Sequence, residues 1–429
     1  MNEIKQLLDS LKSIFLLLCG RVCAKVLSFL FILFVSQEFG VVSVGQIALL
    51  YTLASGAAII AGCGIPTYFL KSMAIADDKR YVFISGNYSV ITLSLILGGV
   101  CISILLAGGL YYLDPETLST VFCALILFIP YGLVQLNLSA LRALAKDWSV
   151  VIVDLTVSAL PIIFLFLVIR LFNNPYQFDV KYTIIAAYVI TLGLSLHIVL
   201  RHLQFKLKTS INAKNIYSPI VKARSFFLVT FSMFLNGYIS IFIIYSLLGS
   251  EQLGVFYIVN SLTGICLIIL TVVNSWIAPQ FAKAYQDNDI QYLGILSRKA
   301  NSLAFILALP IFLILVLFAK EILDMYKIYS ENTHKVLVSM VLFQAINLYF
   351  CSSGYLLAMS GNEKFYAKLI VLSAVIDGVS SFVLIPYLGL LGAAIGGGLA
   401  LGFWNAACFI KCKKVFGFSP SWYPGHQGI

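Results

Sequence analysis

The chain has 429 residues, of which 61% are hydrophobic and 11% are charged. Ordinary globular proteins have about 45–50% apolar and about 25% charged residues. The composition therefore disfavours a soluble enzyme, a nucleic-acid-binding protein, a disordered protein and a secreted disulfide scaffold, and it predicts a protein whose solvent is lipid. The net charge of +10 indicates basic loops on the cytoplasmic side of a membrane.

The N-terminal residues 1–13 form the first predicted element. Ile4, Leu7, Leu8 and Leu11 follow one another at the spacing of one helix face. This pattern predicts an amphipathic helix at the membrane surface before the first span, and it does not resemble a cleavable signal peptide.

Long apolar runs fill most of the remaining chain. A helix needs about 20 apolar residues to cross the ~30 Å hydrocarbon core. Turn residues and charges divide the runs into twelve predicted spans, so the predicted fold is an all-α polytopic membrane protein. The spans lie at about 14–35, 42–66, 83–109, 118–139, 150–171, 182–200, 225–248, 254–279, 301–319, 335–359, 367–386 and 390–410. A Pro/Gly turn at 385–389 joins the last two.

The basic residues provide an independent test of this layout. With a cytoplasmic N-terminus, 21 of the 28 Lys and Arg residues fall in cytoplasmic segments and five in periplasmic ones. Since loops rich in Lys and Arg stay in the cytoplasm, both termini are predicted to be cytoplasmic. The remaining two, Arg21 and Lys25, fall within the first span.

The longest predicted loop divides the chain into two lobes of six spans. It carries six basic residues and no acidic residue, so it is expected to lie against anionic lipid. The predicted parts are an interfacial helix, an N-lobe, a basic cytoplasmic linker, a C-lobe and a cytoplasmic tail, at residues 1–13, 14–200, 201–224, 225–410 and 411–429.

The two halves show weak self-similarity. Residues 38–41 and 252–255 each open an apolar run that continues to a proline, Pro66 in one half and Pro279 in the other. Interrupted helices in corresponding positions are typical of a transporter built from repeats around a central site. Two interpretations of the prolines stay open: they bend their helices near the cytoplasmic ends, or they mark helix ends.

Arg21 and Lys25 are the residues that topology leaves unexplained. Their i, i+4 spacing places them on one helix face, about 6 Å apart along the axis. Each would cost roughly 2.5–3.5 kcal/mol if it faced lipid at the membrane centre. We therefore predict that they line a path for an anion. The alternative is that Asp154 and Asp377, the acidic residues placed deepest in the spans, neutralise them.

The two acidic residues and several amides are further candidates. Asp154 is either a counter-ion of Arg21 or a site that couples transport to a proton or cation, and Asp377 has either a coupling or a packing role. The amide side chains either bond between helices or line a cavity for sugars. These amides are Asn236, Asn260, Asn274 and Gln280.

The sequence contains no motif for catalysis or for a cofactor. The four His residues are scattered, no second Cys or His pair completes a metal site around Cys19 and Cys23, and no phosphate-binding loop is present. We therefore expect no enzymatic activity, no cofactor and no metal. The glycine-rich run at 389–402 lies within an apolar span, so it predicts close helix packing.

Two segments carry a family resemblance. Residues 354–364 and 384–396 resemble the tenth to twelfth helices of bacterial polysaccharide flippases of the multidrug/oligosaccharidyl-lipid/polysaccharide exporter (MOP) superfamily. Residues 253–257 and 278–280, at the two ends of the eighth span, are also similar. The most similar group is the Wzx-type O-antigen flippases.

The resemblance implies both a fold and a function. It implies two six-helix lobes that move an undecaprenyl-diphosphate-linked oligosaccharide across the bacterial inner membrane by alternating access. Membrane lipids, an O-antigen polymerase and a chain-length regulator are the implied partners. Arg21 and Lys25 fit the role of pyrophosphate ligands, and Arg298 with Lys299 are the nearest candidates in the second lobe. Asp377 stands where the family commonly has Asn, which favours a structural role.

Two alternative functions stay open. An O-antigen polymerase or ligase would carry a large periplasmic loop, and the predicted periplasmic loops are short. An ion-coupled multidrug exporter of the same superfamily would favour several membrane acids for cationic drugs, whereas Asp154 and Asp377 stand beside two bases.

Overall fold

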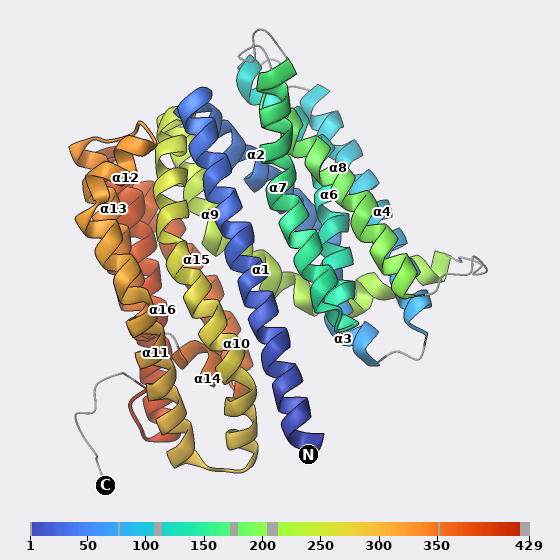
Figure 1. The fold of residues 1–429 in the computed structure, drawn as a ribbon, viewed down its shortest axis with the longest axis vertical. Coiled ribbons are helices and arrows are strands. Elements are labelled where there is room, and N and C mark those ends of the chain that lie inside the picture. The colour runs from blue at the N-terminus through green and yellow to red at the C-terminus, as the bar shows by residue number, and fades with distance from the viewer. Residues whose placement is uncertain are drawn as a thin grey trace. The chain divides into compact units, whose positions relative to one another are not determined.

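The computed structural model describes residues 2–75, 78–106, 114–171, 179–203, 213–350 and 352–420. Within these ranges nearly every residue is helical and no strand is present (Figure 1). A helix satisfies its backbone hydrogen bonds inside its own segment, which is what lipid demands of an apolar chain. The predicted all-α fold is confirmed.

The helices follow one another along the chain as labelled in Figure 1. They are α1 (Asn2–Glu38), α2 (Val41–Gly62), α3 (Ile65–Ile75), α4 (Lys79–Ile104), α6 (Pro115–Ala143), α7 (Asp147–Leu171), α8 (Lys181–His202), α9 (Ala213–Thr263), α10 (Ile265–Gln286), α11 (Ile290–Leu317), α12 (Ala319–Met325), α13 (Glu331–Tyr349), α14 (Ser352–Met359), α15 (Glu363–Leu388) and α16 (Leu390–Phe416).

The chain is a multi-pass membrane protein. Among the described residues, ten helices are long and apolar enough to cross a membrane, or eleven if the bent pair α13 and α14 is one span. One of the ten, Phe226–Leu270, has 45 residues and would measure about 68 Å if straight, more than twice the hydrocarbon thickness. Its α9 part contains Gly249, whose backbone angles are not helical (φ 82°, ψ −176°). The number twelve and the cytoplasmic termini stay predictions.

Element boundaries near the N-terminus differ from the sequence prediction. Residues 2–38 form one unbroken helix that contains the predicted surface segment and the predicted first span, and the position of the segment at the membrane surface stays a prediction. The second predicted span is interrupted at Cys63 and Gly64, which have positive φ values of 45° and 78°. Pro66 therefore lies in the first turn of α3. Backbone N–H groups in the first turn have no partner within the helix, so the missing N–H of proline costs no hydrogen bond there.

The eighth predicted span is interrupted by glycine as well. The helical run ends at Thr263, Gly264 is a turn residue, and α10 begins at Ile265. α10 then continues through Pro279 to Gln286. The basic linker predicted at 201–224 lies partly outside the described residues, which resume at 213. Residues 421–429 of the predicted tail also lie outside them.

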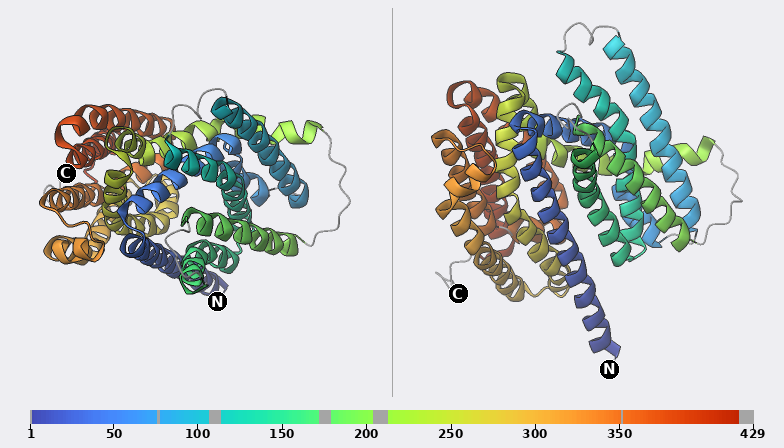
Figure 2. Two further views of the ribbon diagram at one scale, coloured as in Figure 1. Left: turned by 90° about the horizontal axis from the view of Figure 1, so that it is seen from above. Right: turned by 45° about the horizontal axis from the view of Figure 1, so that its top comes forward.

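The helices divide into two compact units. Unit 1 comprises residues 1–39 and 46–231, and unit 2 comprises 40–45 and 232–429. In unit 1, α1 and α8 pack against α7, and α6 packs against α3, α4, α7 and α8. In unit 2, α16 packs against α13, α14 and α15, while α11 packs against α10, α12, α13 and α14 (Figures 1 and 2).

Glycines allow the closest helix contacts of unit 2. Gly389 (φ 57°) alone separates α15 from α16. A Cβ added to Gly392 would lie 2.5 Å from the backbone carbonyl of Leu384, so the two helices touch through their backbones, as small residues permit. The start of α2 meets α9 in the same way, because a Cβ on Gly45 would lie 1.8 Å from the carbonyl oxygen of Ser250.

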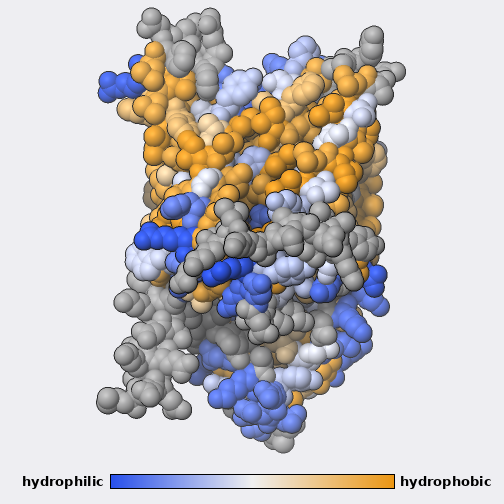
Figure 3. All heavy atoms as spheres, turned by 90° about the vertical axis from the view of Figure 1, so that its right-hand side faces the viewer, coloured by the Kyte–Doolittle hydropathy of each residue, from blue (hydrophilic) through white to orange (hydrophobic). Residues whose placement is uncertain are grey.

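Polar side chains cap several helix ends. Asp78, Asp114, Asp289 and Ser330 accept hydrogen bonds from the first backbone amides of α4, α6, α11 and α13, which lack partners inside the helix. Figure 3 shows the complementary feature, a broad band of apolar side chains on one face with polar side chains gathered below it. Such a band suits contact with lipid.

Candidate functional site

The first predicted pair lies on α1 of unit 1. Arg21 is exposed, and Lys25 is half-buried with its Nζ 5.3 Å from the ring centre of Phe29. Gly20, the residue before Arg21, packs closely against α7. A Cβ added to Gly20 would lie only 2.6 Å from the Val151 side chain. The α1 backbone beside Arg21 therefore lies directly on the first turns of α7.

Asp154 lies near Arg21, on α7. It lies three residues, nearly one helix turn, after Val151 and is half-buried. Its carboxylate interacts electrostatically with the guanidinium groups of Arg142 and Arg21. The direct ion pairs found among the described residues lie elsewhere, at Lys181–Asp179 and Lys335–Glu331. Asp154 therefore acts on the two arginines across a gap and leaves their donors available.

Arg142 is the residue that sequence reasoning missed. It lies in the last turn of α6, three residues beyond the predicted end of the fourth span, in a segment that the sequence predicts to be cytoplasmic. Its side chain is exposed, and α6 packs against α7. The signal that could have identified Arg142 is its position at the end of one helix of a short hairpin whose other helix carries Asp154. We name Arg21, Lys25, Arg142 and Asp154 the cationic cluster.

The cationic cluster has an excess of positive charge. Three of its side chains are basic and one is acidic, and all four belong to candidate spans of unit 1. Guanidinium groups offer several N–H donors that match phosphate oxygens in pairs. The arrangement can hold an anion such as a phosphate or a diphosphate, and the acid can take its place when no anion is bound.

The third predicted pyrophosphate ligand lies in unit 2. Arg298 is half-buried on α11, and its Nε donates a 3.2 Å hydrogen bond to the carbonyl of Gly294 in its own helix. Arg21 and Lys25 belong to unit 1. A shared role of these residues stays a prediction.

Asp377 has a different environment from Asp154. It is only 5% exposed on α15. Its Oδ1 accepts a 2.9 Å hydrogen bond from Ser240 of α9 and a 3.0 Å bond from Ser381. Among the described residues no basic side chain forms an ion pair with it. Two hydroxyls of unit 2 therefore hydrogen-bond to one oxygen of this carboxyl.

The predicted amides lie on α9 and α10. Asn260 and Gln280 are half-buried. Asn274 is 1% exposed, and its Oδ1, like Nδ2 of Asn236, is buried without a hydrogen-bond partner among the described residues. A buried polar group without a partner is costly, so these two positions are suited to an additional polar group.

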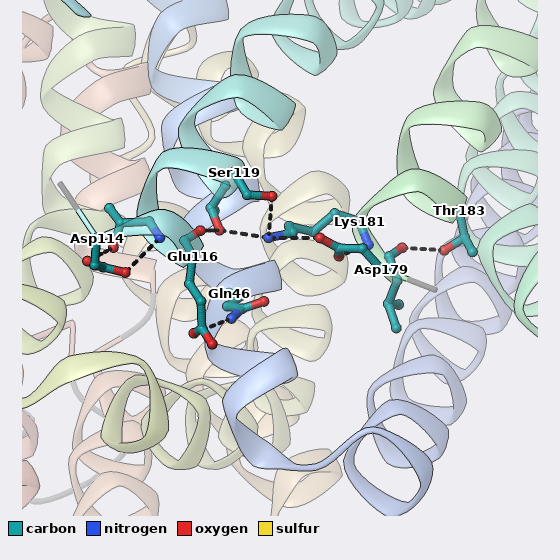
Figure 4. A network of polar contacts seen from close by, with 10 residues as sticks. Gln46, Asp114, Glu116, Ser119, Asp179, Lys181 and Thr183 are labelled. Carbon is teal, nitrogen blue, oxygen red and sulfur yellow. Dashed lines mark hydrogen bonds and ion pairs between the residues drawn. The ribbon is translucent and has the colours of Figure 1, made fainter. Parts of the chain in front are cut away.

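A second ionic network lies at the start of α8 (Figure 4). The Lys181 ammonium is 3.0 Å from Asp179 and donates to the hydroxyls of Thr120 (3.0 Å) and Ser119 (3.3 Å) of α6. Lys181 is 2% exposed. Every donor direction is used inside the protein, so this buried lysine ties α8 to α6 and is not a ligand-binding group.

A hydrogen-bonded acid caps the neighbouring helix end. Asp114 accepts bonds from the backbone and the hydroxyl of Thr117, which holds the pKa of the Asp114 carboxyl below its ordinary value. Gln46 of α2 donates a 3.0 Å bond to Glu116 of α6. In the part of the chain that the structure describes, no three metal-ligating side chains come together.

Comparisons with known proteins bear on this arrangement. The sequence model of the polysaccharide biosynthesis protein family matches residues 10–285. No curated protein sequence matches the chain.

Several solved structures share the fold. An inward-facing multidrug resistance MATE transporter of the MOP superfamily has a TM-score of 0.72 at 16% identity, over 92% of this chain and 94% of that one. An outward-facing conformation of such a transporter has a TM-score of 0.63 at 16% identity, over 95% and 96%. A MOP transporter from Pyrococcus furiosus, with a binding pocket of reversed polarity, has a TM-score of 0.56 at 14% identity, over 94% of each chain.

Proposed function

Because the chain belongs to the polysaccharide biosynthesis protein family, we propose that it is a flippase of the bacterial inner membrane. It moves an undecaprenyl-diphosphate-linked O-antigen oligosaccharide from the cytoplasmic to the periplasmic leaflet. Two six-helix lobes, 14–200 and 225–410, do this by alternating access. The protein acts among membrane lipids without a cofactor, and an O-antigen polymerase and a chain-length regulator are its partners downstream.

The cationic cluster is the observation that carries this proposal. Isolated charges inside a membrane are costly, so they mark binding sites or ion paths. Arg21 and Arg142 come from two helices, and both interact with Asp154. Two guanidinium groups near one acid suit a diphosphate, whose oxygens can displace the weaker counter-ion. Lys25, one helix turn from Arg21, adds a third positive charge.

The other candidate residues have roles that follow from their surroundings. The unpartnered amide atoms of Asn236 and Asn274 support hydrogen bonding to sugar hydroxyls, and Asn260 and Gln280 lie on the same two helices, α9 and α10. Arg298 supplies positive charge to the second lobe. These assignments rest on residue chemistry and on the burial of each side chain.

The direction of transport needs a source of free energy. Outward movement of an anion is favoured by an inside-negative membrane potential, by roughly 2.3 kcal/mol per charge per 100 mV. This contribution requires that the cargo keeps its negative charge, which the cationic cluster permits. Asp154 serves as the counter-ion that resets the empty site.

A cationic-drug exporter is the main alternative function. The fold similarity to multidrug transporters is compatible with it. The charge at the candidate site has the opposite sign, because bases outnumber acids in the cationic cluster. A polymerase or ligase is less compatible, since such a protein would carry a large periplasmic loop and the predicted periplasmic loops are short.

The decisive experiment measures lipid movement directly. Purified protein is reconstituted into vesicles that contain a fluorescent polyprenyl-diphosphate oligosaccharide, and a membrane-impermeant quencher reports the fraction in the outer leaflet. The wild type is expected to move this lipid, and Arg21→Ala with Lys25→Ala is expected to reduce the initial rate at least about tenfold. The same double variant should fail to restore O-antigen display in a strain that lacks its flippase.

A matched control separates local charge from total charge. Lys335→Ala removes an exposed base from α13 and should leave the rate unchanged. Normal O-antigen display by the double variant, at a normal protein level, would contradict the assignment of the cationic cluster as the diphosphate site.

A further inference from the structure

The chain turns back into unit 2 after its last helix. Gly417 has φ 75°, and its amide donates a 3.1 Å hydrogen bond to the carbonyl of Lys413, the ordinary way in which glycine ends a helix. Phe418 and Pro420 then lie along α11. We name residues 417–420 the C-terminal hook.

Aromatic contacts hold the first part of the C-terminal hook in place. The Phe418 ring stacks on Phe416, with centroids 5.8 Å apart, and Phe416 meets the edge of Tyr285 at 6.4 Å. On the α11 side, a Cβ added to Gly294 would lie 3.3–3.5 Å from the Phe418 ring. Glycine at 294 therefore provides the space that the ring occupies.

Buried polar groups hold the second part. The backbone carbonyl of Pro420 accepts hydrogen bonds from Nδ2 of Asn301 and, over 3.5 Å, from Oγ of Ser297. Both of these α11 side chains are fully buried. Leaving such groups without their acceptor costs about 1–3 kcal/mol, so the hook is an internal part of unit 2.

The same two side chains hold the start of α14. Oδ1 of Asn301 accepts a 2.9 Å bond from the backbone amide of Ser352, and Ser297 and Ser352 share a 2.7 Å hydroxyl contact. The first amides of a helix have no partner within it, so Asn301 caps α14 from outside. α14 is bent by 41° from α13. Asn301 thus joins the hook to the bend.

We propose that the C-terminal hook is a latch that holds α14 at its bend against α13. With the C-terminal hook in place on α11, Nδ2 of Asn301 donates to Pro420 and Oδ1 accepts from Ser352, so both ends of the side-chain amide are held. With the hook released, the Asn301 side chain loses its Pro420 partner and its orientation, and the start of α14 loses its external cap. Unit 2 then has two arrangements of α14, one with its external cap and one without it. Conformational switches are built from elements of this type. This inference concerns unit 2 alone and goes beyond the proposed transport.

A native thiol reports the position of α14. Sγ of Cys412 on α16 donates a 3.4 Å hydrogen bond to the carbonyl of Ser353 on α14, and Cys412 is fully buried. Movement of α14 away from α16 would uncover this thiol. Cys266 on α10 and Cys123 on α6 are also buried, and among the described residues neither forms such a bond to α14, so they report general unfolding.

The test measures thiol reactivity in the full-length protein in membrane vesicles. N-ethylmaleimide modification of each cysteine is followed over time by peptide mass spectrometry. Phe418→Ala removes the ring from the hook, and Gly294→Val fills the space on α11 that this ring occupies. Both variants should raise the modification rate of Cys412 about tenfold, the change expected when local opening becomes easier by one buried hydrogen bond. The rates of Cys266 and Cys123 should not change.

Two further variants complete the design. Ser302→Ala removes a hydroxyl that bonds to the carbonyl of Arg298 in its own helix, and it should leave Cys412 protected. Gly294→Ala requires the Phe418 ring to shift by only a few tenths of an ångström, and it should raise the Cys412 rate by a smaller factor without unfolding the protein. Cys412 protection as in wild type in the Gly294 and Phe418 variants would overturn the latch.

Discussion

Ser240 of α9 donates a hydrogen bond to the Asp377 carboxylate of α15 over 2.9 Å, although the two residues are 137 positions apart. Ser381 donates to the same oxygen over 3.0 Å. An acid at this depth needs compensation for the water it has lost. Here the compensation comes from hydroxyl groups of unit 2, which supports a structural role for Asp377.

Replacement of Asp377 therefore affects stability before activity. Asp377→Leu leaves the hydroxyls of Ser240 and Ser381 without their acceptor, and the free energy of unfolding should fall by about 1–3 kcal/mol. Asp377→Asn keeps an oxygen at the same place and should cost less. Thermal unfolding in detergent measures both, and Asp287→Asn, an exposed acid, is the control. A transport rate for Asp377→Asn within about twofold of wild type is expected, and a complete loss at normal stability would instead assign Asp377 to coupling.

The sequence predicts helices better than it predicts which distant residues meet. Apolar runs determine the helical fold, because lipid permits few other structures. Arg142 is missed because a base near the end of a span already has an explanation in the positive-inside rule. The contact of Asn301 with Pro420 joins residues 119 positions apart, and no local pattern indicates that the tail turns back. The interruptions at Cys63–Gly64 and Gly264 are missed because an isolated glycine inside an apolar run is also compatible with a continuous helix.

Lys181 is expected to be essential for the packing of α8 on α6. Lys181→Met removes the ammonium but keeps most of the apolar stem, so the Thr120 hydroxyl and the Asp179 carboxylate each lose one interaction. Thr120 still donates to the carbonyl of Glu116, and Asp179 still accepts from the backbone amide of residue 181. The free energy of unfolding should fall by about 1–3 kcal/mol, measured by thermal unfolding. Lys335→Met breaks the exposed pair with Glu331 and should cost under about 1 kcal/mol. Equal effects of the two substitutions would show that burial of the Lys181 ion pair adds nothing to the free energy of unfolding.

Gly45 is expected to tolerate no side chain. Any Cβ there would overlap the carbonyl oxygen of Ser250, so Gly45→Leu must separate the start of α2 from α9. We expect loss of monodisperse protein in size-exclusion chromatography. Gly99→Leu is the matched control, since a Cβ at Gly99 on α4 meets nothing within 4 Å. Normal behaviour of the Gly45 variant would show that this contact is dispensable.

The cap of α6 should depend on pH. Hydrogen bonds from Thr117 hold the pKa of Asp114 below its usual 3.8. A carboxyl whose pKa is lowered by folding stabilises the protein fully above its unfolded pKa and loses this effect as the pH falls through the folded pKa. The destabilisation caused by Asp114→Ala, about 0.5–1 kcal/mol near pH 6, should therefore shrink near pH 3. Thermal unfolding at the two pH values measures it, and an equal difference at both would contradict the ionised cap.

The cationic cluster offers the most direct test of the binding site, because its acid and its bases should act in opposite directions. Asp154→Asn removes the negative charge that opposes an anion, so inorganic pyrophosphate should bind more tightly. Arg142→Gln removes a donor and should weaken binding about tenfold, equivalent to ~1.4 kcal/mol. Calorimetric titration of the protein in lipid nanodiscs measures both.

A third arginine provides the control for this comparison. Arg170→Gln changes the same residue type at the other end of α7, where the guanidinium lies 5.6 Å from the centre of the Phe166 ring. It alters the net charge of the protein as Arg142→Gln does, and it should leave pyrophosphate affinity unchanged at moderate salt, because charges separated by more than about 10 Å are screened. If Arg170→Gln weakened binding as much as Arg142→Gln, the affinity would reflect total charge and not the site formed with Asp154.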